Sequence, residues 1–193
     1  GYEMLIDFCD QNNIKYERKG LDYFRIFGNQ TYNSFKKQIP SDWSSASFPI
    51  CAAAINNSDV IINGLDINDS QGDKKIIKIL LDMGAKIIRK KDRIHIIKSD
   101  LNGITIDLDD IPDALPILSV VACFAKGTTK LVNAAHARIK ETDRIKVMHD
   151  ELKKAGADVY EQEDGLIIKE SKLNPANFHG HNDHRIVMAL SVL

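Results

Sequence analysis

The hydrophobic pattern of the chain alternates between two kinds of predicted helix. Apolar residues recur at i, i+3 and i+7 over residues 73–83 and 143–155, which predicts amphipathic helices with one buried face. Three other segments are apolar on almost every side and begin near Ala46, Ala114 and Arg185, so we expect these helices to be buried all round. The first two each carry a proline in their expected first turns, where its missing N–H costs no hydrogen bond.

The elements between these helices form a repeat. Each amphipathic helix ends at a glycine, Gly84 in one and Gly156 in the other, and the two glycines lie 72 positions apart. Runs rich in Val, Ile and Thr predict strands at 59–62, 93–97, 128–132 and 165–168. A weaker third copy opens the chain, with an apolar helix at 4–8 and a strand at 23–27. The unit of about 70 residues, ordered helix, strand, helix, strand, strand, predicts an α/β fold.

Composition and charge exclude several classes of protein. The 193 residues are 44% hydrophobic and 27% charged, and the net charge of −1 gives no reason to expect nucleic acid or a membrane surface as partner. Cys9, Cys51 and Cys123 lack the spacing of a disulfide framework or a zinc site, so we expect buried thiols in a reducing compartment. No apolar run reaches the ~18 residues that span a bilayer, and no signal segment opens the chain, which predicts a cytoplasmic protein.

Polar residues gather where the predicted helices begin. Asp42, Asp113 and Asp183 precede the three apolar helices, and Thr142 or Asp143 begins the second amphipathic one. Because Asp, Asn, Ser and Thr are the preferred N-caps, capping is the simplest explanation for any one of these residues.

Capping does not explain the cations found at the same places. Arg185 lies in the first turn of one predicted helix, and Lys140 and Arg144 flank the start of another, where positive charge opposes the helix dipole at a cost on the order of a few tenths of a kcal/mol each. Such cations, with the free N–H groups of a helix start, make a site for phosphate or carboxylate. Asp113 and Glu141 lie in the same segments and are candidate proton donors or acceptors. Pairing of Glu141 with Lys140 or Arg144 in a surface salt bridge is the alternative.

Four motifs, in this order and spacing, resemble those of the 5-enolpyruvylshikimate-3-phosphate (EPSP) synthase family. They are Ile-Pro-Asp-Ala at 111–114, Phe-Ala-Lys-Gly-Thr-Thr at 124–129, Arg-Ile-Lys-Glu-Thr-Asp-Arg-Ile at 138–145 and Asn-Asp-His-Arg-Ile-Val-Met-Ala at 182–189. The stretch 42–47 resembles the family's Asp-x-Ser-Ser-Ala-Ser as well.

This resemblance covers nearly the whole chain and implies its architecture. Family members contain repeated βαβαββ units in two domains of three, an inside-out α/β barrel. Residues 1–39 would be a remnant of the last unit of one domain. Residues 40–193 would belong to the other, with two complete units and the start of a third. The start at Gly1 and the end within an apolar run favour a truncated chain.

The resemblance also implies a reaction. The family transfers the enolpyruvyl group of phosphoenolpyruvate to the 5-hydroxyl of shikimate 3-phosphate and releases phosphate, in the shikimate pathway to chorismate and the aromatic amino acids. It implies these two small-molecule substrates, no cofactor, no metal and a monomer when complete. Asp113 matches the residue that accepts the hydroxyl proton, and Glu141 matches one implicated in proton exchange at the methylene carbon.

The same resemblance implies a set of substrate-binding residues. Lys140 matches a lysine of the shikimate-phosphate site, and Arg144 and Arg185 match the arginines that hold phosphoenolpyruvate. His184 belongs to the same motif as Arg185, with packing as its alternative role. His136 stands where many members carry asparagine. The family's N-terminal lysine, its Ser-Ser-Gln phosphate loop and its late lysine are absent, so we expect no turnover by this chain alone.

Three other functions compete with this one. A UDP-N-acetylglucosamine enolpyruvyl transferase shares the repeat fold but should lack the Lys-Glu-Thr-Asp-Arg segment. RNA 3′-phosphate cyclase has related units, but the near-neutral charge and the few aromatics disfavour an RNA surface. A non-catalytic anion-binding module remains open, because cations alone hold an anion without chemistry.

Overall fold

The computed structural model of the chain describes residues 2–36, 39–90 and 93–193. These residues form two compact units, Gly1–Pro40 with Asn68–Gln71 and Ser41–Ile67 with Gly72–Leu193. None of the helices in the described ranges is long and apolar enough to cross a membrane.

The smaller unit consists of a helix and a hairpin. Helix α1 (Tyr2–Gln11) is followed by the antiparallel strands β1 (Tyr16–Lys19) and β2 (Tyr23–Ile26). Asn13 ends the helix with a φ of 53°, in the left-handed region that asparagine tolerates better than most residues. The helix and the strand predicted at the start of the chain are confirmed.

The larger unit contains the two predicted repeats and the start of a third. The first repeat contains α2 (Trp43–Ile55), β3 (Asp59–Asn63), α3 (Lys75–Asp82), β4 (Lys86–Arg89) and β5 (Arg93–Ile97). The second contains β6 (Thr105–Asp107), α4 (Leu115–Phe124), β7 (Thr128–Val132), α5 (Arg144–Lys154), β8 (Asp158–Gln162) and β9 (Gly165–Lys169). Helix α6 (His184–Leu190) opens the third. Short 3-10 helices lie at Gly72–Lys74, Pro112–Ala114 and Ala135–Ile139.

Each repeat folds into its own sheet. The first has the order β3-β5-β4, and the second has the order β6-β7-β9-β8. All neighbours are antiparallel except β6 and β7, which are parallel. Strand β6 was not predicted from the pattern, because it has only three residues. It makes the second repeat a complete βαβαββ unit, which confirms the α/β repeat.

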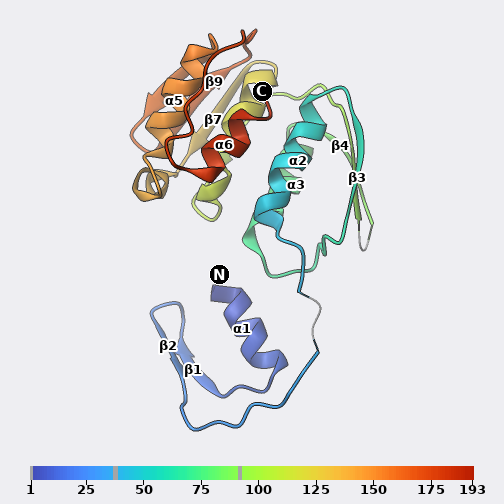
Figure 1. The fold of residues 1–193 in the computed structure, drawn as a ribbon, viewed down its shortest axis with the longest axis vertical. Helices are drawn as coiled ribbons and strands as arrows, with labels where there is room; N and C mark the ends of the chain where they lie inside the picture. The colour runs from blue at the N-terminus through green and yellow to red at the C-terminus, as the bar shows by residue number, and fades with distance from the viewer. Residues whose placement is uncertain (1, 37–38, 91–92) are drawn as a thin grey trace. The chain divides into compact units, whose positions relative to one another are not determined.

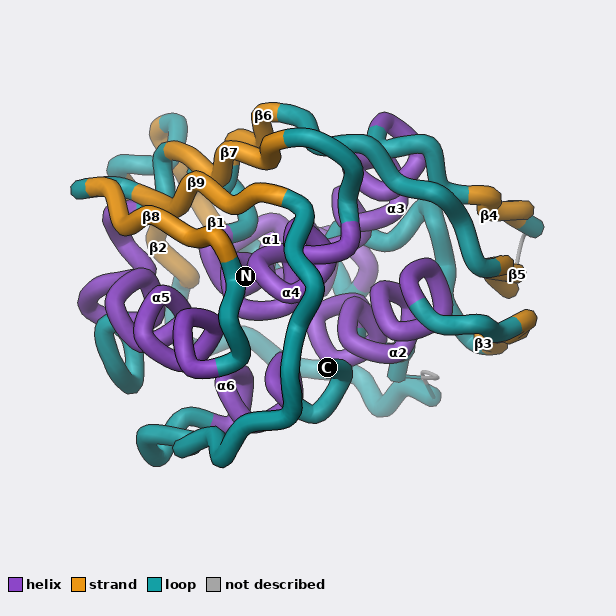
Figure 2. Tube along the Cα trace, turned by 90° about the horizontal axis from the view of Figure 1, so that it is seen from above, coloured by secondary structure: helices purple, strands orange, loops and turns teal. Residues whose placement is uncertain are grey.

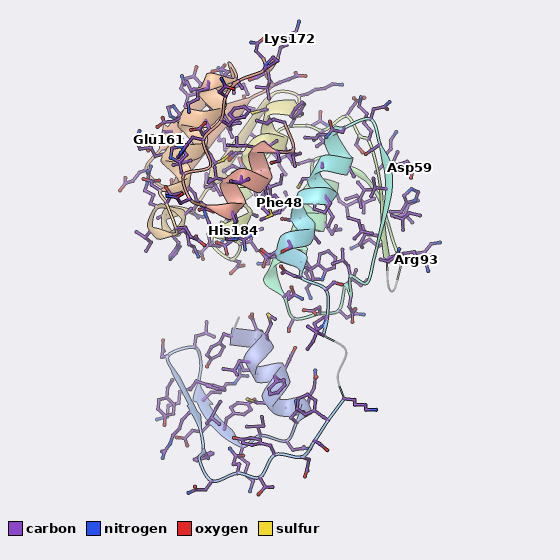
Figure 3. All side chains as sticks on the ribbon, in the orientation of Figure 1. Phe48, Asp59, Arg93, Glu161, Lys172 and His184 are labelled. Carbon is purple, nitrogen blue, oxygen red and sulfur yellow. The ribbon has the colours of Figure 1, made fainter. Side chains whose placement is uncertain are left out.

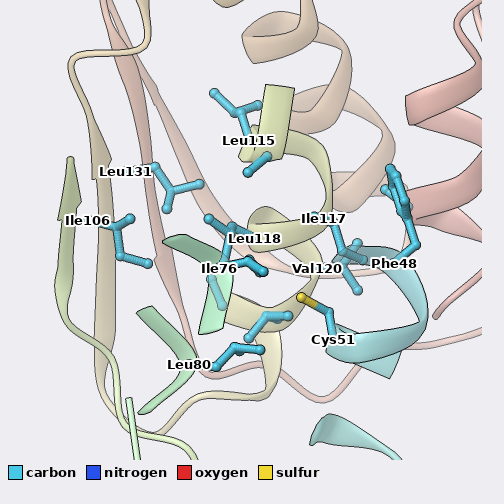
Figure 4. Packing of buried hydrophobic residues seen from close by; sticks show 14 of the residues in the cluster. Phe48, Cys51, Ile76, Leu80, Ile106, Leu115, Ile117, Leu118, Val120 and Leu131 are labelled. Carbon is cyan, nitrogen blue, oxygen red and sulfur yellow. The ribbon is translucent and has the colours of Figure 1, made fainter. Parts of the chain in front are cut away.

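In the larger unit, helices α2 and α4 are the most deeply buried elements. Figures 1 and 2 show α2 and α4 side by side, each covered on one flank by strands of its own repeat. Helix α4 also packs against α5 and α6, and every residue from Leu115 to Cys123 is buried, as predicted for a helix enclosed on all sides. Figure 4 shows this core, in which residues of α4 face Phe48, Cys51, Ile76, Leu80, Ile106 and Leu131. The three cysteines are all buried, as predicted.

The expected place of Pro49 in a first turn is wrong. Helix α2 begins at Trp43, three residues before the predicted start near Ala46, so Pro49 lies in the helix interior. Its ring nitrogen cannot donate to the carbonyl of Ser45 four residues back, and one helical hydrogen bond is lost. Pro116 does lie in the first turn of α4, as expected.

The repeat extends to hydrogen bonds that the sequence did not predict. Gly84 and Gly156 have φ values of 100° and 87° and end α3 and α5 in the same way. Ser99 and Ser171, also 72 positions apart, come just after β5 and β9. In each repeat the serine Oγ accepts a hydrogen bond from the backbone N–H of the first residue of β4 or β8, at 2.7 Å and 2.9 Å.

Candidate active site

Arg144, the first residue of α5, lies among three carboxylates. Its side chain is 1% exposed, and its Nε lies 2.7 Å from Asp183 Oδ2. One terminal nitrogen lies 2.8 Å from Asp113 Oδ1 and the other 2.5 Å from Glu141 Oε2. Burial by itself would lower the pKa of Arg144, but the hydrogen bond that it donates to Asp183 and the nearby negative charges raise it above its ordinary value. The charged guanidinium therefore joins the starts of α4, α5 and α6.

Asp113 is the acidic residue that capping does not explain. It lies within the 3-10 turn before α4, and neither that turn nor α4 has a side-chain cap. Its carboxylate lies 3.3 Å from Lys140 Nζ and 3.6 Å from a terminal nitrogen of Arg185, in addition to its contact with Arg144. Burial would raise the pKa of Asp113, but Arg185, Lys140 and Arg144 together lower it. Asp113 is therefore an ionised carboxylate surrounded by cations.

The other acidic residues at helix starts are confirmed as N-caps. Asp42 accepts hydrogen bonds from the backbone N–H groups two and three residues on, at 3.0 Å and 3.1 Å. Asp143 accepts one from three residues on at 3.0 Å, and Asp183 accepts one from two residues on at 2.9 Å. Asp183 both caps α6 and binds Arg144, a second role that the sequence did not reveal.

Glu141 pairs with Arg144, so the salt bridge considered as the alternative is present, although its arginine is buried. Lys140, by contrast, pairs with Asp113 in the described structure. The side chain of Glu141 is 46% exposed, and its second carboxylate oxygen lies 4.0 Å from Nδ1 of His184. His184 is well exposed, and Figure 3 shows it at the start of α6. Glu141 is thus held from one side and open on the other.

His136 lies apart from these charges. It is in the 3-10 helix Ala135–Ile139 and its side chain is exposed. Within the described residues, no hydrogen bond or ion pair joins it to the cluster. Lys140, Arg144 and Arg185, by contrast, all contact Asp113, Glu141 contacts Arg144, and His184 lies beside Glu141.

Asp73 is a neighbour of the cluster that the sequence did not identify. It lies in the 3-10 turn that precedes α3, and its carboxyl group is half-buried. Burial raises the pKa of Asp73, and the charges of Asp113 and Asp42 add to this effect against the opposing charge of Arg185. A search for charged residues at every equivalent helix start of the repeat would have included it, because α3 corresponds to α5.

Arg138 fixes the segment that carries Lys140 and Glu141. Its guanidinium donates to Asp143 Oδ2 at 2.8 Å and to two backbone carbonyls, one at the end of β8 at 2.6 Å and one in the turn that follows at 2.7 Å. It also lies 2.9 Å from Glu161, which Figure 3 labels. Both ends of the segment are therefore tied to the second repeat.

The charges of this cluster do not by themselves favour a polyanion. Five carboxylates lie within electrostatic reach, those of Asp42, Asp73, Asp113, Glu141 and Asp183. Only three cations among the described residues share the cluster with them, Lys140, Arg144 and Arg185. An anion with more than one charge needs further cations from outside this cluster, or must displace a carboxylate from one of these three.

Comparison with known proteins relates these motifs to a family. A family model described as EPSP synthase (3-phosphoshikimate 1-carboxyvinyltransferase) matches residues 2–193. The 3-phosphoshikimate 1-carboxyvinyltransferase of Ruminiclostridium cellulolyticum is 48% identical over 190 residues, which are 98% of this chain and 45% of the relative. That of Methanocaldococcus jannaschii is 42% identical and covers 98% of this chain and 44% of the relative.

Solved structures agree with the sequence comparison. EPSP synthase from Acinetobacter baumannii matches with a TM-score of 0.81 and 34% identity, over 98% of this chain and 46% of that one. The chain thus spans about half the length of the curated relatives and solved structures that it matches. It belongs to the EPSP synthase (3-phosphoshikimate 1-carboxyvinyltransferase) family.

Proposed function

We propose that this chain contributes one side of an active site that transfers the enolpyruvyl group of phosphoenolpyruvate to the 5-hydroxyl of shikimate 3-phosphate. In the first step the hydroxyl oxygen bonds to C2 of phosphoenolpyruvate while C3 gains a proton. In the second step C3 loses a proton, the bond from C2 to the phosphate oxygen breaks, and phosphate leaves. The reaction requires a group that accepts the hydroxyl proton, a group that exchanges protons with C3, and cations for the anionic substrates.

The observation that carries this proposal is the position of Asp113. It caps no helix, yet its carboxylate is held by Arg144, Lys140 and Arg185. A carboxylate fixed among cations and partly open to solvent suits the acceptor of the hydroxyl proton, because the substrates that bind these cations come to lie beside it.

Binding of the substrates is expected to make Asp113 a stronger base. The three cations lower its pKa in the free chain. A phosphate or carboxylate group that pairs with Lys140 or Arg185 offsets their positive charge at Asp113, and this raises the pKa of Asp113 toward a value suited to proton transfer.

The remaining roles follow from the neighbouring contacts. Glu141 is held by Arg144 on one oxygen and is open on the other, which suits proton exchange at C3. We assign Lys140 to the shikimate 3-phosphate side, and Arg144 and Arg185 to phosphoenolpyruvate. His184 is assigned to an outer contact with a substrate phosphate. His136 is a candidate substrate contact with no support from the geometry.

The charge balance of the cluster explains why this chain alone should not turn over. Five carboxylates against three cations leave too little positive charge for two phosphates and a carboxylate. The remaining cations would come from the part of the protein that the relatives have and this chain does not span.

The test uses this chain and a longer protein that contains it together with the remaining length of its relatives. We expect phosphate release from the two substrates by the longer protein and none by the 193-residue chain. Asp113→Ala and Glu141→Ala in the longer protein should each abolish turnover and leave substrate binding within about threefold. If binding and rate fall together, the proton-transfer roles are wrong and an anion-binding module is favoured. Release of phosphate by the short chain would overturn the argument from charge.

The domain boundary and the state of the complete protein are part of the same proposal. We propose that residues 1–39 belong to one domain and 40–193 to the other, which is supported by the division of the chain after Pro40. The complete protein is proposed to act as a cytoplasmic monomer. Light scattering during gel filtration tests the oligomeric state, and cell fractionation tests the location.

A further inference from the structure

A second group of charged residues lies outside the cluster around Arg144. Glu151, in α5, has a side chain that is only 1% exposed. Its carboxylate accepts hydrogen bonds from His181 Nε2 at 2.7 Å, from Lys154 Nζ at 2.7 Å and from the backbone N–H of His179 at 3.1 Å. The proposed reaction assigns no role to these residues.

Two of these donors lie in the turn that leads into α6. His181 and Asn182 have φ values of 49° and 58°, so two successive residues other than glycine adopt the left-handed conformation. Such a conformation persists where the surrounding structure holds it. Asp183 follows at once, and its backbone N–H donates to the carbonyl of Gly180 at 2.9 Å. A Cβ at Gly180 would lie 2.4 Å from Cγ2 of Val187, so the turn also packs closely against α6.

Helix α5 therefore holds this turn at two points. Arg144 binds Asp183, and Glu151 binds His181. Arg144 and Glu151 are seven residues apart on one helix, two turns or about 10 Å along its axis. Two separate contacts restrict the rotation of this turn more than either contact would alone.

Stability alone does not require a buried carboxylate here. A well-packed apolar side chain in place of a buried ion pair is often as stable or more stable. An apolar residue cannot fix the position of a hydrogen-bond donor. A carboxylate held in one place can, because each hydrogen bond to it defines where the donor lies.

We propose that Glu151 and His181 are positioning residues that hold the turn before α6, and so set where Asp183 and Arg185 stand relative to Arg144 and Asp113 for anion binding. The inference rests on the proposed function, because it takes phosphoenolpyruvate as the anion.

Two substitutions of His181 separate positioning from general stability. His181→Asn keeps a residue that tolerates a positive φ but is too short to reach Glu151. His181→Gln places an amide nitrogen near the position of Nε2 and can restore the hydrogen bond. Lys154→Met is the matched control, because it removes another donor to the same carboxylate without touching the turn.

The first measurement is the affinity for phosphoenolpyruvate of the longer protein that contains this chain, from NMR titration, with the melting temperature of each variant recorded alongside. His181→Asn should weaken binding about tenfold, the lower end of what a hydrogen bond to a charged group contributes. His181→Gln should return it to within about twofold of the unaltered longer protein, and Lys154→Met should leave it unchanged. If His181→Asn lowers the melting temperature but not the affinity, the residue is only structural and the proposal is wrong.

The second measurement needs no ligand. The backbone N–H of Arg185 donates to Asp183 at 2.9 Å, so its hydrogen exchange reports how firmly the start of α6 is held. We expect exchange at Arg185 to be at least about tenfold faster in His181→Asn and to be restored in His181→Gln. Unchanged exchange would overturn the proposal. Failure of the unaltered longer protein to bind phosphoenolpyruvate, with the expected exchange pattern, would instead count against the proposed function.

Discussion

The two repeats of the larger unit have the same order of helices and strands but use their helix starts differently. In the first repeat, α3 begins without a side-chain cap, and its first residue Lys75 is half exposed and pairs with Asp110 at the surface. In the second, Asp143 caps α5, and its first residue Arg144 is buried against three carboxylates.

The two helices that precede them differ as well. Asp42 at the start of α2 caps its helix, whereas Asp113 before α4 caps nothing and is held by cations. The two repeats therefore have helix starts at equivalent positions. The residues at each start decide whether a charged side chain caps its helix or belongs to the charged cluster. The difference can be tested at matched positions of the two repeats.

The largest difference is expected between Arg144 and Lys75, the first residues of the two corresponding helices. Arg144→Ala leaves a fully buried Asp183 and two further carboxylates without their cation, and should lower the free energy of unfolding by about 3–5 kcal/mol. Lys75→Ala removes an exposed pair and should cost less than about 1 kcal/mol. Urea denaturation of the larger unit measures both. Equal losses in the free energy of unfolding would show that the buried Arg144 contributes no more to stability than the exposed Lys75.

A smaller difference is expected between the two capping residues Asp183 and Asp42. Asparagine caps a helix as well as aspartate does, so Asp42→Asn should be nearly neutral. Asp183→Asn keeps the cap but weakens the pair with Arg144, and should cost about 2–3 kcal/mol at pH 7.

The effect of Asp183→Asn should also depend on pH. Burial raises the pKa of Asp183, but Arg144 and the backbone N–H groups lower it below its ordinary value. The stability that it contributes is therefore fully present above the unfolded pKa of about 3.9 and is lost as pH falls through the lower folded pKa. Denaturation curves from pH 7 to pH 2.5 should converge for the parent and the Asn variant. A gap that stays constant with pH would contradict the ionic origin of the effect.

The smallest effect is expected at Asp73, and it has the opposite sign. Burial and the charges of Asp113 and Asp42 raise the pKa of Asp73, so its ionised form destabilises the folded chain above the unfolded pKa. Asp73→Asn should therefore raise the urea midpoint at pH 7, and the gain should disappear as pH falls below about 4. A loss of stability at pH 7 would mean that Asp73 is held as an anion, as Asp113 is.

The features of the fold that depend on neighbouring residues were predicted from the sequence. The glycines that end α3 and α5 and the caps Asp42, Asp143 and Asp183 depend on residues near them in sequence, and these predictions are confirmed. Strand β6 and the interior position of Pro49 were missed. A strand of three residues has too little periodicity to detect, and the start of α2 depends on a cap that lies outside its apolar run.

The sequence predicted which residues form the candidate site, but it did not predict which of them pair with one another. The charged segments were singled out because cations at helix starts are unfavourable without a ligand or partner. Which carboxylate each cation binds was not predictable, since Arg144 and Asp183 are 39 positions apart and Glu151 and His181 are 30 apart.

The sequence by itself determined the repeat, the caps of α2, α5 and α6 and the family, because each is encoded by residues close together in the chain and by motifs in a fixed order. The tertiary structure alone decided that Arg144 is enclosed by three carboxylates and that Asp113 faces cations instead of capping a helix. The physical reason is that packing α4, α5 and α6 together brings their first turns to one place, where buried charges must find partners from distant segments.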